Sequence, residues 1–203
     1  MHRNIWAVGR NYAEHAKEMN AQINASPLIF LKAGSTPNLN SKIQLPSWSQ
    51  EVHHEIEIAL LLKQQSNSSN FSFSHITLAI DLTARDKQAE AKKSGAPWTL
   101  SKSFSGATPL APWIPIDQIK DLKSLSFQLS INEKPVQKGF YQEMIFSPEY
   151  LKTHIQEHFP LCDNDILLTG TPAGVGPLQK GDKLNAILLE DNQSILTCQW
   201  SVE

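Results

Sequence analysis

The stretch Glu51–Leu62, which reads EVHHEIEIALLL, constrains the fold more than any other part of the chain. In an extended strand successive side chains alternate between two faces, so Glu55 and Glu57 project to one side, roughly 7 Å apart. Ile56 and Ile58 project to the other side and can enter a hydrophobic core. The stretch therefore predicts a strand with one apolar face and one face that carries two carboxylates.

Two neighbouring carboxylates on one strand have two interpretations. They are either exposed at a solvated strand edge or held together in a buried site. Burial of an unpaired carboxylate is costly, and a second carboxylate beside it adds like-charge repulsion. A hard divalent cation removes both costs, because Mg²⁺, Mn²⁺ and Ca²⁺ prefer oxygen ligands. The second interpretation predicts two-thirds of a metal site at Glu55 and Glu57.

Asp81 is the natural third ligand of such a site. It ends the strand-like run His75–Asp81, directly before a predicted helix, where side chains often reach into a site. The adjacent His53 and His54 raise the alternative of zinc, but alternation points their rings to opposite faces. Zinc would also need a third nitrogen or sulfur ligand, which the sequence does not place. We interpret the two histidines as packing neighbours.

The composition limits the classes of function. The chain has 203 residues, 40% of them hydrophobic and 19% charged, and we expect one domain over residues 1–203. A net charge of −2 gives no basic stripe, which argues against a nucleic-acid partner. We expect no membrane segment or signal peptide, and a cytoplasmic location. Cys162 and Cys198 lack metal-ligand spacing and are interpreted as small hydrophobes, with a disulfide left open.

The periodicity predicts a strand-rich chain with about three helices. Strands are expected over residues 5–9, 27–32, 51–62, 75–81, 125–131, near 136, and over 166–168, 183–189 and 194–200. Helices are expected over residues 11–19, 83–95 and 147–159. Asn11 and Ser147 are the predicted N-caps of the first and third helices, and Thr83 with Asp86 forms a predicted capping box. Without regular βαβ alternation, these elements predict an α+β fold.

Two further groups of residues carry candidate chemistry. His15 and Glu18 lie three residues apart on one helical face, so they form either a surface ion pair or a carboxylate-oriented base. Lys32 and Lys102 are each flanked by apolar residues. Each is therefore either a snorkelling lysine or a buried lysine that binds a substrate carboxylate.

The loop TGTPAGVG has glycines that permit close backbone approach, and Thr169 or Thr171 could donate a hydroxyl to a ligand. It lacks the lysine and the spacing of a phosphate-binding loop, so it is a weak signal for a nucleotide.

Seven motifs lie along nearly the whole chain. In order they are GRNYAEHAKE, PLIFLK, HHEIEIAL, DLTARDKQ, PWTLSKSF, MIFSPEYL and LLTGTPAGVGP. Together they resemble the fumarylacetoacetate hydrolase superfamily, in particular its short acylpyruvase/oxaloacetate decarboxylase branch. The resemblance implies mixed β-sheets rolled into a partly open barrel, and a homodimer.

The resemblance also implies roles for individual residues. It implies Mg²⁺ or Mn²⁺, with Ca²⁺ as an alternative, held by Glu55, Glu57 and Asp81. The implied catalytic residues are His15, Glu18 and Lys102. Substrate binding is predicted for five residues within the motifs: Arg10, Lys32, Arg85, Gln88 and Thr171.

The implied activity is that of a metal-dependent enzyme acting on small 2-oxo acids. It would cleave a C–C bond by acylpyruvate hydrolysis or oxaloacetate decarboxylation, through an enolate. Two alternatives stay open. One is an isomerase, tautomerase or hydratase of 2-oxo- or 2-hydroxy-diene-dioates in aromatic catabolism, and the other is a non-catalytic domain with a structural Ca²⁺.

Overall fold

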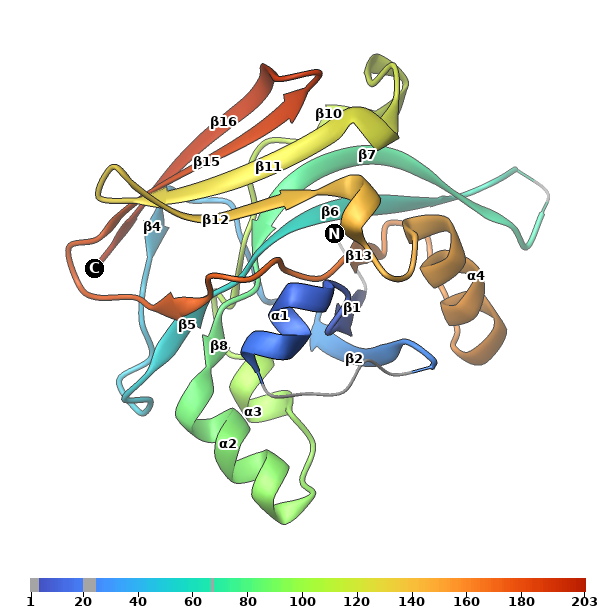
Figure 1. Cartoon of the computed structure of the whole chain (residues 1–203). Helices are drawn as coiled ribbons and strands as arrows, with labels where there is room; N and C mark the ends of the chain where they lie inside the picture. The colour runs from blue at the N-terminus through green and yellow to red at the C-terminus, as the bar shows by residue number, and fades with distance from the viewer. Residues whose placement is uncertain (1–3, 20–24, 67) are drawn as a thin grey trace.

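Strands are the most abundant regular element of the fold (Figure 1). The structure, a computed structural model, describes residues 4–19, 25–66 and 68–203. These ranges contain sixteen β-strands, four α-helices and three short 3-10 helices, which confirms the α+β class with one α-helix more than expected. The elements follow the chain in this order: β1 (Asn4–Gly9), α1 (Ala13–Glu18), β2 (Leu28–Ala33), β3 (Pro37–Asn38), β4 (Lys42–Ile43), β5 (Val52–His54), β6 (Ile56–Gln64), β7 (Phe71–Ile80), β8 (Thr83–Ala84), α2 (Arg85–Ser94), α3 (Thr99–Lys102), β9 (Thr108–Pro109), β10 (Ile114–Pro115), η1 (Ile116–Gln118), η2 (Leu122–Ser124), β11 (Leu125–Ile131), β12 (Lys134–Phe140), η3 (Tyr141–Glu143), α4 (Pro148–His158), β13 (Ile166–Leu168), β14 (Gly176–Pro177), β15 (Lys183–Glu190) and β16 (Gln193–Val202).

Two large sheets form the body of the molecule (Figure 1). The six-stranded sheet has the order β10-β7-β6-β13-β1-β2, and the five-stranded sheet has the order β12-β11-β15-β16-β4. A three-stranded sheet, β14-β5-β8, and the pair β3-β9 complete them. Within the described ranges each order runs from one edge strand to another, so no sheet closes into a barrel, in agreement with the open arrangement expected.

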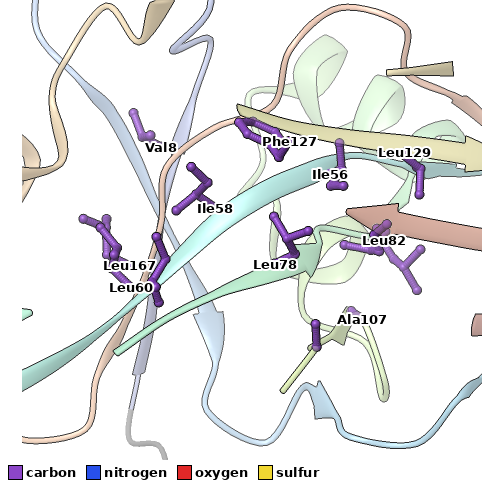
Figure 2. Close-up of a cluster of buried hydrophobic side chains, with 14 of the residues drawn as sticks. Val8, Ile56, Ile58, Leu60, Leu78, Leu82, Ala107, Phe127, Leu129 and Leu167 are labelled. Carbon is purple, nitrogen blue, oxygen red and sulfur yellow. The ribbon is translucent and has the colours of Figure 1, made fainter. Parts of the chain in front are cut away.

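The main hydrophobic core lies between the β6–β7 pair of one sheet and β11 of the other (Figure 2). Ile56 and Ile58 of β6 are fully buried, as are Phe127 and Leu129 of β11, and all four belong to one cluster. The face of β6 that carries the isoleucines therefore enters the core, as alternation predicts. The same alternation directs Glu57 to the opposite face.

The strand predicted over residues 51–62 is interrupted at Glu55. Before this residue β5 pairs with β8 and β14, and after it β6 pairs with β7 and β13. At the interruption the Glu55 carbonyl oxygen accepts a hydrogen bond of 2.7 Å from the backbone N–H of Asp81, which follows β7. The chain thus changes sheets at Glu55, and this change brings Asp81 beside the two glutamates.

The helix termini confirm one predicted cap and correct another. Ser147 caps α4, where its hydroxyl oxygen accepts a hydrogen bond of 3.3 Å from the N–H of Tyr150. The capping box of Thr83 and Asp86 is wrong, because Asp86 instead accepts a hydrogen bond of 2.6 Å from the hydroxyl of Ser49. In the part of the chain that the structure describes, no helix is both long and apolar enough to cross a membrane.

Asn11 does not cap α1, whose N-cap position is Tyr12. The Asn11 side chain is fully buried, and its Nδ2 donates to the carbonyl oxygens of Phe146 at 2.9 Å and Thr169 at 2.8 Å. Its Oδ1 accepts a hydrogen bond of 2.7 Å from the N–H of Phe146. The predicted cap is wrong, because the side chain bonds to residues that are distant in sequence. These hydrogen bonds join three segments of the chain, and we call Asn11 the clamp between them.

We expect Asn11→Ala to lower the free energy of unfolding by about 2 to 5 kcal/mol, since each buried group left without a partner costs about 1 to 3 kcal/mol. Urea unfolding followed by circular dichroism measures the change. The control is Asn40→Ala, at an exposed position, which should stay within about 0.5 kcal/mol of the wild type. Equal stability of Asn11→Ala and the wild type would contradict the clamp.

Candidate active site

Three buried carboxylates form the centre of the candidate site. Glu55, Glu57 and Asp81 are 5%, 2% and 0% exposed, and each offers an oxygen within 4.8 Å of the others. This burial excludes the interpretation of a solvated strand edge. Glu55 comes from the junction of β5 with β6, which the sequence did not predict, whereas Glu57 lies on a strand and Asp81 directly after one, as predicted.

Three cations from separate elements surround the carboxylates. Lys102 of α3 donates to Glu55 Oε2 at 2.7 Å and also to Asp81 Oδ2. Lys32 of β2, which is fully buried, donates to Asp81 Oδ1 and to the carbonyl oxygen of Ala107 at 2.8 Å. Arg85, at the start of α2, donates to Glu55 Oε1. Both lysines are buried, which excludes the snorkelling alternative, and their partners here are carboxylates of the protein.

The two glutamates have opposite electrostatic surroundings. Burial would raise the pKa of Glu55, but Lys102 and Arg85 hold it well below its ordinary value. Burial and the negative charges of Asp81 and Glu55 raise the pKa of Glu57 well above its ordinary value. The backbone N–H of Gly170, 2.6 Å from Glu57 Oε2, opposes that rise only in part. The surroundings of Glu57 therefore hold too little positive charge to balance an ionised carboxylate at this position.

His15 and Glu18 form the predicted oriented pair. His15 Nδ1 lies 3.2 Å from Glu18 Oε2, and the N–H of Gly174 donates to the Glu18 carboxylate at 3.1 Å. Only glycine fits at 174, because its φ is +97° and a Cβ there would lie 2.0 Å from the carbonyl oxygen of Val136. The imidazole lines the same cavity as the carboxylates, and Glu18 leaves its Nε2 as the available nitrogen.

A small, partly open cavity lies over the carboxylates. It is lined by four of the five predicted substrate-binding residues: Arg10, Arg85, Gln88 and Thr171. The fifth, Lys32, lies beneath the cluster on Asp81. Arg10 has a left-handed backbone with φ of +62°, an uncommon conformation for a residue other than glycine and one that recurs at functional sites.

Six residues that line the cavity were not predicted, among them Phe30, Lys92 and Trp98. The rings of Phe30 and Trp98 lie 5.6 Å apart, and the Lys92 ammonium lies 5.5 Å from the Trp98 ring centre. Partial burial, together with the charges of Arg85 and Arg10, lowers the pKa of Lys92. The sequence does contain a pattern that could have placed Lys92 in the site. Lys92 follows Arg85 and Gln88 on one face of α2 at spacings of three and four.

The two adjacent histidines do not take part in the carboxylate cluster. His54 is buried and its Nδ1 lies 2.9 Å from Gln137 Oε1. His53 Nε2 lies 2.7 Å from Glu51, and the Nε of Arg85 donates to its Nδ1 at 3.3 Å. Both histidines act as neighbours of the site, in line with their interpretation from the sequence.

Comparisons with known proteins place most of the chain beside one family. Residues 4–199 match the family described as fumarylacetoacetate (FAA) hydrolase C-terminal. A mitochondrial oxaloacetate tautomerase from Mus musculus is 37% identical over 191 residues, which cover 91% of this chain and 86% of that protein. A mitochondrial oxaloacetate decarboxylase from Dictyostelium discoideum is 39% identical over 186 residues, which cover 88% and 85%.

Two solved structures share the fold. A candidate fumarylacetoacetate isomerase/hydrolase from Oleispira antarctica is 38% identical, with a TM-score of 0.92 over 100% of this chain and 94% of that chain. A fumarylpyruvate hydrolase from Pseudomonas aeruginosa, solved in complex with Mn²⁺ and pyruvate, is 24% identical, with a TM-score of 0.89 over 99% and 89%. The second likeness establishes the fold alone.

The two glutamates should respond oppositely to neutralisation in metal-free protein at pH 8. Glu55→Gln should lower the melting temperature by roughly 10 °C, because Lys102 and Arg85 lose a buried charge partner. Glu57→Gln should raise the melting temperature, because the unfolded chain ionises this group freely whereas the folded chain resists ionisation. Scanning calorimetry measures both changes.

The pH dependence of these melting temperatures supplies the control for the two variants. A folded-state pKa raised above the unfolded value makes the wild type gain stability as the pH falls toward the unfolded-state pKa of Glu57. The advantage of Glu57→Gln should therefore shrink between pH 8 and pH 5. Shifts of the same sign for both variants at pH 8 would refute the assignment of opposite surroundings.

Proposed function

The chain belongs to the fumarylacetoacetate hydrolase family, and from that premise we propose that it is a divalent-metal-dependent enzyme that decarboxylates and tautomerises oxaloacetate. The observation that carries the proposal is the buried Glu55–Glu57–Asp81 cluster at the bottom of a cavity lined by cations. Relatives named oxaloacetate tautomerase and oxaloacetate decarboxylase support a 2-oxo acid as the substrate.

The three carboxylates fit a hard divalent cation. Their donor atoms are all oxygens, which Mg²⁺ and Mn²⁺ prefer, and they lie within 4.8 Å of one another. The raised pKa of Glu57 marks a deficit of positive charge that a shared cation would remove. Glu55, Glu57 and Asp81 would therefore hold Mg²⁺ or Mn²⁺. The ion would supply Lewis-acid stabilisation of negative charge on the substrate.

The mouth of the cavity suits an anionic substrate. Arg10 and Lys92 line it, and partial burial with the charges of Arg85 and Arg10 lowers the pKa of Lys92. Burial is the larger cause of this shift in pKa, and the smaller contributions of Arg85 and Arg10 reflect an excess of positive charge along this part of the lining. A substrate carboxylate would compensate that excess and fix the orientation of the molecule in the cavity.

Decarboxylation uses the groups that stabilise an enolate. The C3–C4 bond of oxaloacetate breaks, C4 leaves as CO₂, and the electron pair of the bond forms the enolate of pyruvate with its charge on the C2 oxygen. Lys102 remains an ammonium, because Asp81 and Glu55 raise its pKa against the opposing effect of burial. Its positive charge stabilises the developing enolate, and no water has to be activated.

Tautomerisation adds the transfer of one proton. The proton leaves C3 and a proton is added to the C2 oxygen, so the keto and enol forms interconvert without a break in the carbon chain. Because Glu18 accepts a hydrogen bond from Nδ1 of His15, the neutral ring carries its lone pair on Nε2. Nε2 is the atom that takes the C3 proton.

Acylpyruvate hydrolysis is a second candidate, favoured by the orientation of His15 through Glu18 and Gly174. His15 Nε2 would take a proton from water as the water oxygen attacks the distal carbonyl at C4. The C3–C4 bond then breaks, which releases a carboxylic acid and the enolate of pyruvate. The reaction shares its enolate half with decarboxylation and differs in its need for a base.

Removal of the divalent ion should abolish turnover. In EDTA the consumption of oxaloacetate, followed by ultraviolet absorbance, should fall to the uncatalysed rate, and Mg²⁺ or Mn²⁺ should restore it. Asp81→Asn should not be restored, since one charged ligand is gone. The exposed Asp117→Asn serves as the control and should respond as the wild type does. Full turnover in excess EDTA would rule out the metal-dependent mechanism.

His15→Ala should separate the reactions. Hydrolysis of acetylpyruvate and tautomerisation of oxaloacetate should fall by about 10²- to 10⁴-fold, because both need a base, whereas decarboxylation should fall by less than about tenfold. Coupled assays of the three reactions measure the effect, with His154→Ala on α4 as the control. An equal fall in all three rates would show that His15 has no selective role as a base.

A further inference from the structure

We propose that Gln137 of β12 is a positioning residue of this site: it orients the Thr171 hydroxyl as a donor into the cavity and anchors the backbone between Glu55 and Glu57. The proposal rests on the proposed function for the identity of the ligand. Gln137 lies on the five-stranded sheet, whereas the carboxylates lie on and beside the six-stranded sheet. Its side chain is 3% exposed and connects the two.

The Gln137 amide uses its full hydrogen-bonding capacity. Its Oε1 accepts from the backbone N–H of Ile56 at 3.1 Å and faces Nδ1 of His54 at 2.9 Å. Its Nε2 donates to Thr171 Oγ1 at 2.8 Å and to the carbonyl oxygen of Pro172 at 2.9 Å. A glutamine amide offers two donors and one oxygen with two acceptor positions, so all of its sites are filled.

The direction of this amide is fixed by groups that cannot reverse their roles. The N–H of Ile56 can only donate, and the carbonyl oxygen of Pro172 can only accept. If the amide were rotated by half a turn, its NH₂ group would face the N–H of Ile56 and its oxygen would face the carbonyl oxygen of Pro172. Both backbone groups would then be buried without a hydrogen-bond partner. Such losses cost about 1 to 3 kcal/mol each, so the observed direction is strongly preferred.

The fixed amide determines what the Thr171 hydroxyl can do. Because Oγ1 accepts a hydrogen bond from Gln137, its own proton points away from Gln137 and is available in the cavity that Thr171 lines. Thr169, the other threonine considered from the sequence, donates its hydroxyl proton to the carbonyl oxygen of Ile58 at 3.0 Å. Thr171 is therefore the loop threonine that can donate to a carboxylate or keto oxygen of the substrate.

The same amide supports the strand that carries the carboxylates. Ile56 is the first residue of β6, directly after the interruption at Glu55. There Gln137 supplies the acceptor for the Ile56 N–H from the other sheet. One side chain thus fixes the strand between Glu55 and Glu57 and the loop that carries Thr171.

The experiment compares Gln137→Glu with Thr171→Val in a double-mutant cycle. Glutamate keeps the shape of the side chain and its acceptor for Ile56, but its carboxylate cannot donate to Thr171. The threonine hydroxyl would then turn to donate to residue 137 and would be lost to the ligand. The readouts are the dissociation constant of pyruvate with Mg²⁺-loaded protein, by titration calorimetry, and kcat and KM for oxaloacetate.

Each single variant should weaken pyruvate binding by about 10- to 100-fold, the range for one hydrogen bond to a charged acceptor. The double variant should bind no more weakly than either single variant. The control is Gln199→Glu, an exposed glutamine on β16 of the same sheet, which should bind as the wild type does. Additive losses in the double variant, or wild-type binding by Gln137→Glu, would overturn the positioning role.

Thr171→Ser tests the proposal without any change at Gln137. If Gln137 orients the hydroxyl, serine should bind pyruvate within about threefold of the wild type, although it lacks the methyl group that restricts the rotamer of threonine. A loss as large as that of Thr171→Val would show that packing of the methyl group, and not Gln137, sets the orientation. An absence of pyruvate binding by the wild type would instead contradict the proposed function.

Discussion

The repulsion among three buried carboxylates is the constraint on which the surrounding structure depends. The fold offsets that repulsion with one cation from each of three separate elements: Lys32 from β2, Arg85 from α2 and Lys102 from α3. These ion pairs also hold the three elements against the β5–β6 junction and the end of β7, so the same contacts neutralise the charge and stabilise the tertiary structure. Across the described ranges Glu57 forms no such ion pair, and its raised pKa marks the place for a further positive charge.

The backbone around the carboxylates passes from one sheet to another. At Glu55 the chain leaves the three-stranded sheet and enters the six-stranded one, and the carbonyl of Glu55 binds the N–H of Asp81 across the gap. A strand that changes sheets leaves backbone groups without ladder partners. The Gln137 amide satisfies one of them, at Ile56, from a third sheet. The irregular backbone that the site requires is therefore stabilised by long-range side-chain contacts.

Local patterns in the sequence predicted the parts of the site that depend on local geometry. Alternation over residues 51–62 predicted Glu55 and Glu57 on one side, and helical spacing paired His15 with Glu18. The role of Asn11 could not be predicted, because its partners at Phe146 and Thr169 are more than a hundred residues away and no local pattern encodes them. The same holds for Phe30 and Trp98, which look like ordinary core residues, and for Gln137, an isolated glutamine in a strand. The resemblance to a family supplied the roles of the motif residues, which periodicity alone left open.

The site separates the step that the candidate reactions share from the steps that distinguish them. In the proposed mechanism, stabilisation of enolate charge falls to Lys102 on α3 and to the divalent ion that Glu55, Glu57 and Asp81 would hold. The proposal assigns the transfer of protons to His15 on α1, whose partner Glu18 accepts a hydrogen bond from the loop at Gly174. Because the two sets lie on different elements, a change in α1 or in that loop can alter the balance between decarboxylation, tautomerisation and hydrolysis while the carboxylate cluster stays intact. Relatives of comparable identity that carry the names tautomerase and decarboxylase are consistent with this separation.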